Sequence, residues 1–324
     1  MTKAQKKYIG LAIKLLVFGL ATWYIIVKVT DQGSLDKFKT LLNGLEHQSV
    51  VMTLSIVVFL MFANWLLEVV KWQYLSRRIE KISFWTAFQS VFCGLTWAIF
   101  TPNRLGEYGG RVLFLKPENR ARGAVAMGVG LFAQLVLTSM AGALSIAWFV
   151  CKFLETPVSV QFGVWLLAIL YGLGFLVLYF NVSWVDVLVG KVRWLKRVKP
   201  FFSVLEDYTL KELAVVLFNS FARFVIFTSQ YIILMEAMLP DLPFVSTVLM
   251  IFILFFVQSA LPTLDIFDFS VRSFVASNLY SYITTQEIAV MAIVSCIWFV
   301  NLILPAIFGS VFVFKINFFG DSKS

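Results

Sequence analysis

Three charged side chains in the first third of the chain follow a proline at spacings that suit the binding of an anion. Arg104, Glu107 and Arg111 stand at positions i, i+3 and i+7, so a helix would carry them on one face. Arginine binds phosphate through two parallel hydrogen bonds, and a helix that starts after Pro102 exposes its first backbone N–H groups. The pattern predicts an anion seat in which Glu107 orients the arginines. The alternative is a helix cap at the cytoplasmic surface with ordinary surface ion pairs.

A second candidate ligand for an anion is an arginine inside an apolar segment. Arg223 lies in the segment 213–239, and Asn219 and Gln230 share its face at helical spacing. Such an arginine must face a bundle interior or a wet cavity, because the bilayer centre costs it about 2.5–3.5 kcal/mol. We expect Arg223 to bind an anionic headgroup.

Glu68, near the end of the apolar segment 49–70, is the acidic candidate for the same site. If Arg223 pairs with Glu68 or with Glu107, Arg223 is a structural residue rather than a ligand. The simplest interpretation of Glu68 itself is a local i, i+3 ion pair with Lys71. The sequence leaves these pairings open.

The second half of the chain carries a less basic counterpart after Pro262. Asp265, Asp268 and Arg272 repeat the i, i+3, i+7 spacing. We expect Asp268 and Arg272 to gate the outer side of the site, with acids that respond to protons if they are desolvated. The alternative is a solvated turn of an outer loop. One DxxD pair, three scattered cysteines and one histidine predict no metal site and no cofactor.

The composition identifies the surroundings of these residues. Of 324 residues, 60% are hydrophobic and 14% are charged. These values exclude a soluble globular domain, a disordered chain, a disulfide scaffold and a zinc protein. The net charge of +9 could indicate nucleic acid, but the cytoplasmic loops of a membrane protein explain it better. Lipid is therefore the expected solvent for most of the chain.

Eight apolar segments are candidates for membrane helices, which need ~20 residues to cross the bilayer. Lys and Arg gather before the first segment and in the loops 71–83, 102–122 and 182–212, as is typical of cytoplasmic loops. Because 84–101 lies between two such loops, it is predicted to be re-entrant, with 243–264 as its counterpart from outside. Six full spans then place both termini in the cytoplasm. The eight segments are 8–29, 49–70, 84–101, 123–150, 161–181, 213–239, 243–264 and 288–314.

The segments form two halves, approximately 49–150 and 213–316, each with a span, a re-entrant segment and a span. The first half starts outside and the second inside, so the repeat is inverted. The leading spans share an Asn followed four residues later by a charge: Asn64 with Glu68, and Asn219 with Arg223. We therefore predict an all-α integral membrane protein, with one transmembrane domain over 1–324, about six full transmembrane helices and two opposed re-entrant hairpins. Broken segments at matching positions of inverted halves point to a transport site.

The run Thr101-Pro-Asn-Arg-Leu-Gly-Glu-Tyr-Gly-Gly-Arg111 resembles the TP-x-R-x-GE motif of flippase-like membrane proteins, a family related to the transmembrane region of bacterial lysylphosphatidylglycerol synthases. The break at Ala260-Leu261-Pro262 resembles that of the family's second half, although no Gly-Gly pair follows it here. The resemblance implies a multi-pass protein of the bacterial cytoplasmic (inner) membrane. It also implies the lipid-translocating part alone, without a synthase domain.

These observations together predict a transporter, and not an enzyme, that moves an anionic phospholipid or a lipid-linked phosphate between leaflets. Arg104, Arg111 and Arg223 would hold the headgroup phosphate. One alternative is an accessory membrane subunit of a lipid- or glycan-modifying system, and another is a membrane transferase that acts on lipid phosphates. The expected partners are an anionic lipid headgroup and either a second copy of the chain or a lipid-modifying enzyme, with no nucleic acid.

Overall fold

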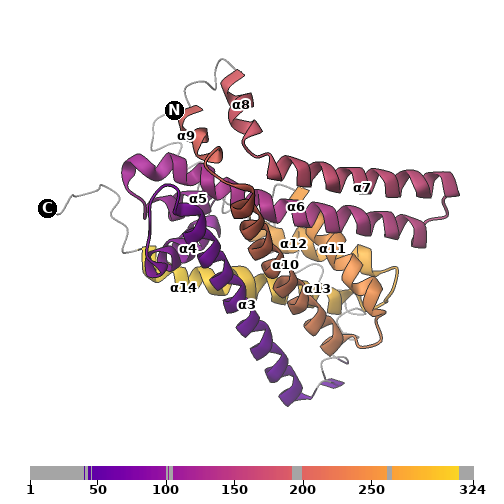
Figure 1. The fold of residues 1–324 in the computed structure, drawn as a ribbon. Coiled ribbons are helices and arrows are strands. Elements are labelled where there is room, and N and C mark those ends of the chain that lie inside the picture. Colours follow the sequence, from indigo (N-terminus) through magenta and orange to yellow (C-terminus); the bar gives the residue numbers. More distant parts are fainter. Residues whose placement is uncertain are drawn as a thin grey trace, which may run out of the picture.

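The computed structural model describes residues 40, 43–44, 46–99, 101, 105–191, 199–260 and 265–313, and no strand occurs in these ranges (Figure 1). The predicted all-α class is confirmed, whereas the predicted first span, 8–29, lies outside the described residues. The helices are α3 (His47–Ser76), α4 (Phe84–Ile99), α5 (Leu105–Val112), α6 (Arg120–Phe153), α7 (Val158–Phe180), α8 (Trp184–Lys191), α9 (Lys199–Phe202), α10 (Leu210–Met238), α11 (Phe244–Ala260), α12 (Asp265–Tyr280), α13 (Glu287–Trp298) and α14 (Leu304–Val313), with short turns η1 (Pro117–Asn119) and η2 (Ser203–Leu205) and a π-helical turn η3 (Phe299–Ile303).

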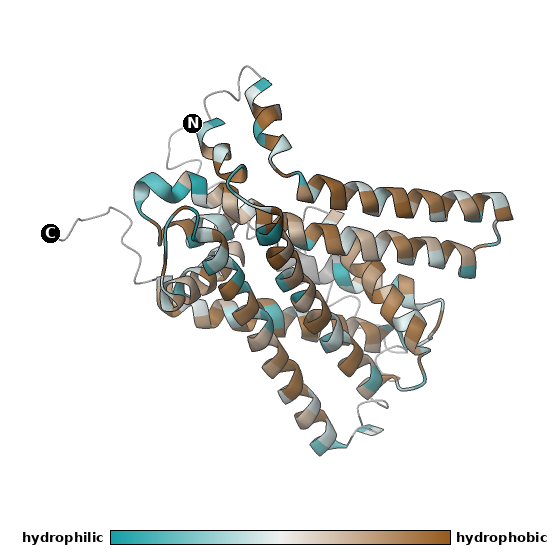
Figure 2. Cartoon of the chain, in the orientation of Figure 1, coloured by the Kyte–Doolittle hydropathy of each residue, from teal (hydrophilic) through white to brown (hydrophobic). Residues whose placement is uncertain are grey.

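Four helical stretches of the described chain are long and apolar enough to cross a membrane. Apolar side chains on their outer faces are exposed, among them Phe59, Phe162 and Leu167. Such a surface is stable in lipid rather than in water. Hydrophobic residues predominate along the long helices (Figure 2). The protein is therefore membrane-embedded. The stretches, His47–Ser76, Pro117–Phe153, Val158–Phe180 and Glu287–Phe312, coincide with the predicted spans 49–70, 123–150, 161–181 and 288–314.

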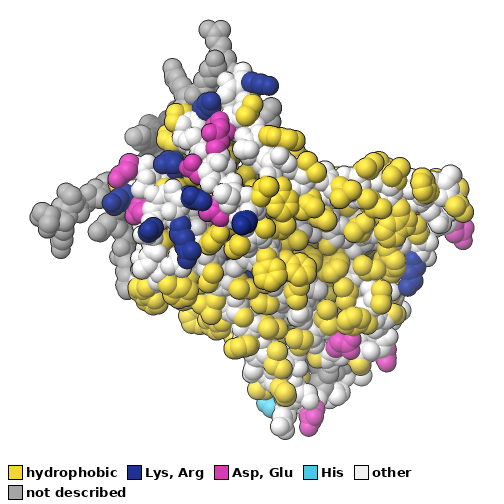
Figure 3. Space-filling view, viewed as in Figure 1, with side chains coloured by type: hydrophobic (Ala, Val, Ile, Leu, Met, Phe, Trp, Pro, Cys, Tyr) yellow, Lys and Arg dark blue, Asp and Glu magenta, His cyan; other side chains and the backbone are white. Residues whose placement is uncertain are grey.

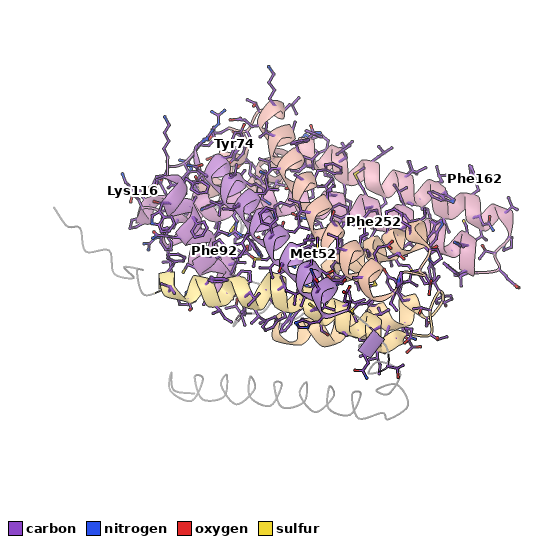
Figure 4. The ribbon with its side chains drawn as sticks, turned by 90° about the horizontal axis from the view of Figure 1, so that it is seen from below. Met52, Tyr74, Phe92, Lys116, Phe162 and Phe252 are labelled. Atoms are coloured by element: carbon purple, nitrogen blue, oxygen red, sulfur yellow. The ribbon has the colours of Figure 1, made fainter. Side chains whose placement is uncertain are left out.

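Charged side chains are concentrated at one end of the molecule. On the face shown in Figure 3, most Lys and Arg side chains lie at the end that contains α5 and α9, and a broad hydrophobic surface covers the helices beyond it. Lys116 and Tyr74 lie toward this end, and Phe162 lies at the far end (Figure 4). This separation of a basic end from an apolar surface is typical of membrane proteins.

The helices α3 and α10 form an antiparallel pair in the middle of the bundle (Figure 1). α10 begins at Leu210 because Thr209 and Glu212 form a capping box, in which each side chain binds the other residue's backbone N–H. Further along the pair, the Gln230 side chain donates to the Val57 carbonyl at 2.8 Å. The pair therefore runs side by side over most of its length.

Glycines let α5 pack directly on the backbone of α4. A Cβ added to Gly110 would lie 2.5 Å from the Gly94 Cα, and one added to Gly106 would lie 2.2 Å from the Trp97 carbonyl oxygen. The Thr101 hydroxyl accepts a hydrogen bond from the Gly106 N–H at 2.6 Å, close to the start of α5. With 16 residues α4 is about 24 Å long, which is shorter than a membrane core of about 30 Å.

Two further contacts join the first half of the chain to the second. Gly142 of α6 packs against Phe256 of α11, where an added Cβ would lie 2.2 Å from the Phe256 Cβ. Gly309 of α14 packs against α4, where an added Cβ would lie 2.0 Å from the Phe92 carbonyl oxygen. In both places a glycine of one half meets a phenylalanine position of the other half. The halves are therefore interlocked rather than separate.

A proline breaks the regular bonding between α13 and α14. Pro305 has no N–H to donate to the carbonyl of Asn301, four residues earlier, and its ring crowds that carbonyl. The chain forms the π-helical turn η3 at this point. The Trp65 indole N–H of α3 donates to the Asn301 carbonyl at 3.2 Å. The backbone group released by Pro305 is therefore bound by a side chain of the central helix pair.

Candidate functional site

Three positively charged side chains converge on one glutamate in the interior of the bundle. Glu68 of α3 accepts Lys71 Nζ at 2.7 Å and Arg111 Nη1 at 2.6 Å, and it also pairs with Arg223 Nη1. Arg111 pairs in addition with Glu107, one helical turn earlier on α5. We call these residues the Glu68 cluster.

Burial distinguishes the members of the Glu68 cluster. Arg111 is 1% exposed and Lys71 2%, whereas the side chain of Arg223 is 13% exposed. Removing a charge from water costs several kcal/mol unless opposite charges and hydrogen bonds replace the water. Glu68 provides that replacement for three cations at once. Arg223 is the member through which the cluster is most accessible from outside.

Local helix geometry and close backbone packing bring the cluster together. Glu68 and Lys71 lie one turn apart on α3, and the Lys71 stem lies against Gly130 of α6, whose carbonyl is 3.5 Å from Nζ. The Arg111 stem lies over Gly94, where an added Cβ would be 3.0 Å from Arg111 Cγ. A larger residue at either glycine would push the charged side chain away from Glu68.

Polar and aromatic groups hold Arg223 in place. Its Nε donates to the Asn64 side-chain oxygen at 3.0 Å, and Nη1 is 3.5 Å from the Gln134 side-chain oxygen. The guanidinium carbon lies 5.3 Å from the centre of the Trp65 ring, within the range of a cation–π interaction. Trp65 also binds the Asn301 carbonyl, so one indole connects the arginine to the π-helical turn of the second half.

The structure unites four of the nine residues predicted for the site. Glu68, Glu107, Arg111 and Arg223 form one ion-pair network, and both the local Glu68–Lys71 pair and the Arg223–Glu68 pair considered above are present. These contacts make Arg223 a partner of a carboxylate in this state. Its part as a headgroup ligand stays a prediction.

The other predicted residues lie elsewhere or outside the described ranges. Gln230 binds the Val57 backbone, and Asn219 has a buried side-chain oxygen with no hydrogen-bond partner in the described structure. Arg272 lies partly buried on α12, the helix that also contains Asp268. Arg104 and the Asp268 side chain lie outside what the structure describes. The predicted gate by Asp268 and Arg272 therefore stays a prediction.

Sequence reasoning missed four residues around the cluster. The sequence predicts Lys71 only as a local partner of Glu68, and its patterns assign no part in the site to Trp65, Asn64 or Gln134. Their sequence signal was weak but present, because Asn64 precedes Glu68 by one helical turn and Gln134 is polar within an apolar segment. Lys71 follows Glu68 on the same face and carries the third positive charge.

The chemistry available at the Glu68 cluster is the binding of anions. Two arginines and a lysine can donate several hydrogen bonds to phosphate or carboxylate oxygens. Among the described residues, no group of three or more His, Cys, Asp or Glu side chains is placed to hold a metal ion. No family model matches the chain, and no curated protein or solved structure matches it significantly. The resemblance to flippase-like proteins therefore stays a prediction.

Proposed function

We propose that this protein moves a lipid with an anionic phosphate headgroup between the two leaflets of a membrane. The observation that carries the proposal is that Lys71, Arg111 and Arg223 all form ion pairs with one carboxylate, that of Glu68, inside a membrane-embedded bundle. Ionisable groups at membrane depth are costly, and they commonly mark the path of a charged substrate. The acyl chains would stay in the bilayer while the headgroup crosses past the cluster.

Arginine suits this role better than a general positive charge. Its planar fork binds two oxygens of a phosphate, and it keeps its charge in an apolar environment. Arg223, the most accessible member of the cluster, would meet the headgroup first, and Arg111 would take a second oxygen. Arg104, which directly precedes α5 in the sequence, would add a further donor.

The two halves would be related as an inverted repeat, with α4–α5 and α11–α12 as opposed re-entrant hairpins. The reciprocal packing of Gly142 on Phe256 and of Gly309 on the Phe92 backbone supports this relation. Each glycine also follows a polar residue by eight positions, Gln134 in α6 and Asn301 in η3. Gln134 lies beside Arg223, and the Asn301 carbonyl binds Trp65, so both face the central helix pair.

The family resemblance and the distribution of charge support a location in the cytoplasmic membrane of a bacterium. The Thr101 to Arg111 run includes Glu107 and Arg111, two members of the cluster. The basic end of the molecule in Figure 3 would face the cytoplasm of a bacterial cell, with both termini on that side.

Bound lipids provide a direct test of the proposal. Wild type, Arg111→Ala, Arg223→Ala and the control Arg78→Ala would be extracted gently from native membranes, and their lipids identified by mass spectrometry. Arg78 also pairs with a glutamate between α3 and α10, but outside the cluster. We expect one anionic lipid to be enriched in wild type and in the control, and to be lost from the two cluster variants.

The enriched lipid would then be followed across the bilayer of reconstituted vesicles. Wild type and Arg78→Ala should exchange it between leaflets, and folded Arg111→Ala should not. If the bound lipids mirror the bulk membrane in all four proteins, or if folded Arg111→Ala transports normally, the proposed headgroup site is wrong. An accessory subunit that copurifies with a protein partner would then be the better hypothesis.

A further inference from the structure

Glu68 already accepts from the three cations that a phosphate headgroup would bind. Its Oε1 accepts Arg111 Nη1 at 2.6 Å, and its Oε2 accepts Lys71 at 2.7 Å and pairs with Arg223. A carboxylate presents two oxygens that share one negative charge, much as a phosphodiester does at its two unesterified oxygens. A headgroup that bound the Nη1 groups of the two arginines would compete with Glu68 for them.

We propose that Glu68 is an internal counter-anion that exchanges with the phosphate group of the substrate. The incoming phosphodiester replaces the Glu68 carboxylate on Arg223 and then on Arg111, and the return of Glu68 expels the phosphodiester. No covalent bond forms or breaks, since the exchange concerns ion pairs and hydrogen bonds alone. The inference rests on the proposed function and names the step by which the site would bind and release its ligand.

Lys71 makes this exchange energetically feasible. A buried carboxylate that lost every partner would cost several kcal/mol, which would prevent the arginines from leaving it. Lys71 lies one turn after Glu68 on α3 and is held against Gly130 of α6. Glu68 therefore keeps a cation when Arg223 and Arg111 turn to a ligand.

The exposure of the cluster gives the order of exchange. Arg223 is 13% exposed at its side chain, whereas Arg111 is 1% exposed. Phosphate can therefore approach Arg223 while Glu68 still holds Arg111. A single negative charge on the ligand suits an exchange of one anion for one carboxylate.

The proposal predicts that the loss of the Glu68 charge affects binding and transport in opposite directions. Glu68→Gln keeps the shape of the side chain but removes the competing anion, so phosphate should bind more tightly. Release should slow down, because no carboxylate returns to the arginines. A glutamate with a purely structural role would instead lower both binding and transport when it is replaced.

Thermal unfolding with added ligand separates these cases. Wild type, Glu68→Gln, Glu68→Asp and Glu212→Gln would be purified in a neutral detergent and titrated with phosphatidylglycerol, phosphatidylcholine or inorganic phosphate alone. Glu212→Gln is the matched control, because it removes one negative charge from the pair between Glu212 of α10 and Arg78, which lies just beyond α3. Leaflet exchange of fluorescent phosphatidylglycerol in vesicles would be measured on the same proteins.

We expect Glu68→Gln to reach half of its maximal thermal stabilisation at a phosphatidylglycerol concentration about tenfold lower than wild type does. Leaflet exchange by Glu68→Gln should be slower than by wild type. Glu212→Gln should match wild type in both measurements. Glu68→Asp keeps the charge on a shorter stem, so it should shift both in the same directions by less. It provides the comparison if Glu68→Gln does not fold.

Other outcomes would contradict either the exchange at Glu68 or the headgroup site itself. If phosphatidylglycerol stabilises wild type and the Glu68 variants at equal concentrations, the exchange is wrong while the headgroup site of the proposed function stands. If phosphatidylglycerol stabilises no protein more than phosphatidylcholine does, and inorganic phosphate has no effect, both are wrong. Tighter binding of inorganic phosphate alone by Glu68→Gln would support the exchange and contradict a lipid ligand.

Discussion

The central helix pair carries two arginine–glutamate ion pairs in opposite surroundings. Near its middle, Arg223 of α10 pairs with Glu68 of α3, and their side chains are 13% and 4% exposed. At one end, Arg78, just beyond α3, pairs with Glu212 of α10 at 2.6 Å, and these side chains are 41% and 21% exposed. The same chemistry between the same two helices thus occurs once in the protein interior and once at the surface.

The difference in exposure shows which of the two ion pairs matters for the stability of the protein. Water solvates Arg78 and Glu212 almost as well as each solvates the other, so an exposed pair contributes little. In the interior no water replaces a lost partner, so the removal of one charge leaves the others uncompensated. The interior pair is therefore the costly one to alter, and it is the one to which the proposed function assigns the binding of the headgroup.

The largest expected effect comes from Glu68→Ala, which leaves Lys71, Arg111 and Arg223 without their common carboxylate. We expect the free energy of unfolding to fall by about 3–5 kcal/mol, as when one partner of a buried ion pair is removed. Unfolding in mixed detergent micelles, followed by helix content, would measure it. A loss below 1 kcal/mol would show that water reaches the cluster freely.

Gly110→Ala tests whether the interior site depends on the approach of α5 to α4. The added Cβ would lie 2.5 Å from the Gly94 Cα, so α5 must shift and carry Arg111 away from Glu68. We expect a loss of about 1–3 kcal/mol and weaker binding of anionic lipid.

The matched control is Gly109→Ala, one residue earlier on the same helix. An added Cβ there meets nothing within 4 Å, and alanine favours a helix over glycine by up to about 1 kcal/mol. This variant should be as stable as wild type or slightly more stable. Equal effects of the two substitutions would contradict the close-packing account.

A smaller effect is expected from Trp65→Phe, which keeps an aromatic ring beside Arg223 but removes the indole N–H. The Asn301 carbonyl, which cannot accept a hydrogen bond from Pro305, would also lose the indole donor, at a cost of about 1–2 kcal/mol. Trp65→Leu should cost more, because it also removes the cation–π contact. If the two variants unfold at the same denaturant concentration, the ring does not stabilise Arg223.

The smallest effect is expected at the surface pair. Glu212→Gln should change stability by about 0.2–1 kcal/mol, and the change should shrink further in high salt. Slight burial would raise the pKa of Glu212, but hydrogen bonds from Thr209 and the nearby Arg78 guanidinium lower it overall. Its contribution is therefore present at neutral pH and lost as the solution is acidified below about pH 4. Unfolding at pH 7 and pH 3 would show a difference between the variant and wild type only at the higher pH.

Some features of the fold and of the site were predictable because they depend on local rules. A segment of about 20 apolar residues must lie in lipid as a helix, so the four spans followed from composition and length. The pairs Glu68–Lys71 and Glu107–Arg111 followed from helical spacing of three and four residues. Spacing alone did not predict the position of Gln230. Seven residues separate it from Arg223, which is about 10 Å along a helix, so its side chain binds the Val57 carbonyl instead of the cluster.

The sequence by itself determined that this chain is helical and membrane-embedded, and that charged residues occur within or next to its apolar segments at fixed local spacing. Only the tertiary structure decided that Arg111 and Arg223, which are 43 and 155 residues from Glu68, meet on that one carboxylate. Helical periodicity places neighbours within a turn, whereas these contacts depend on how closely backbones approach. Gly94 and Gly110 allow that approach between α4 and α5, and Pro305 releases the carbonyl that Trp65 binds. Such packing arises from the fit of distant surfaces, which no local pattern encodes.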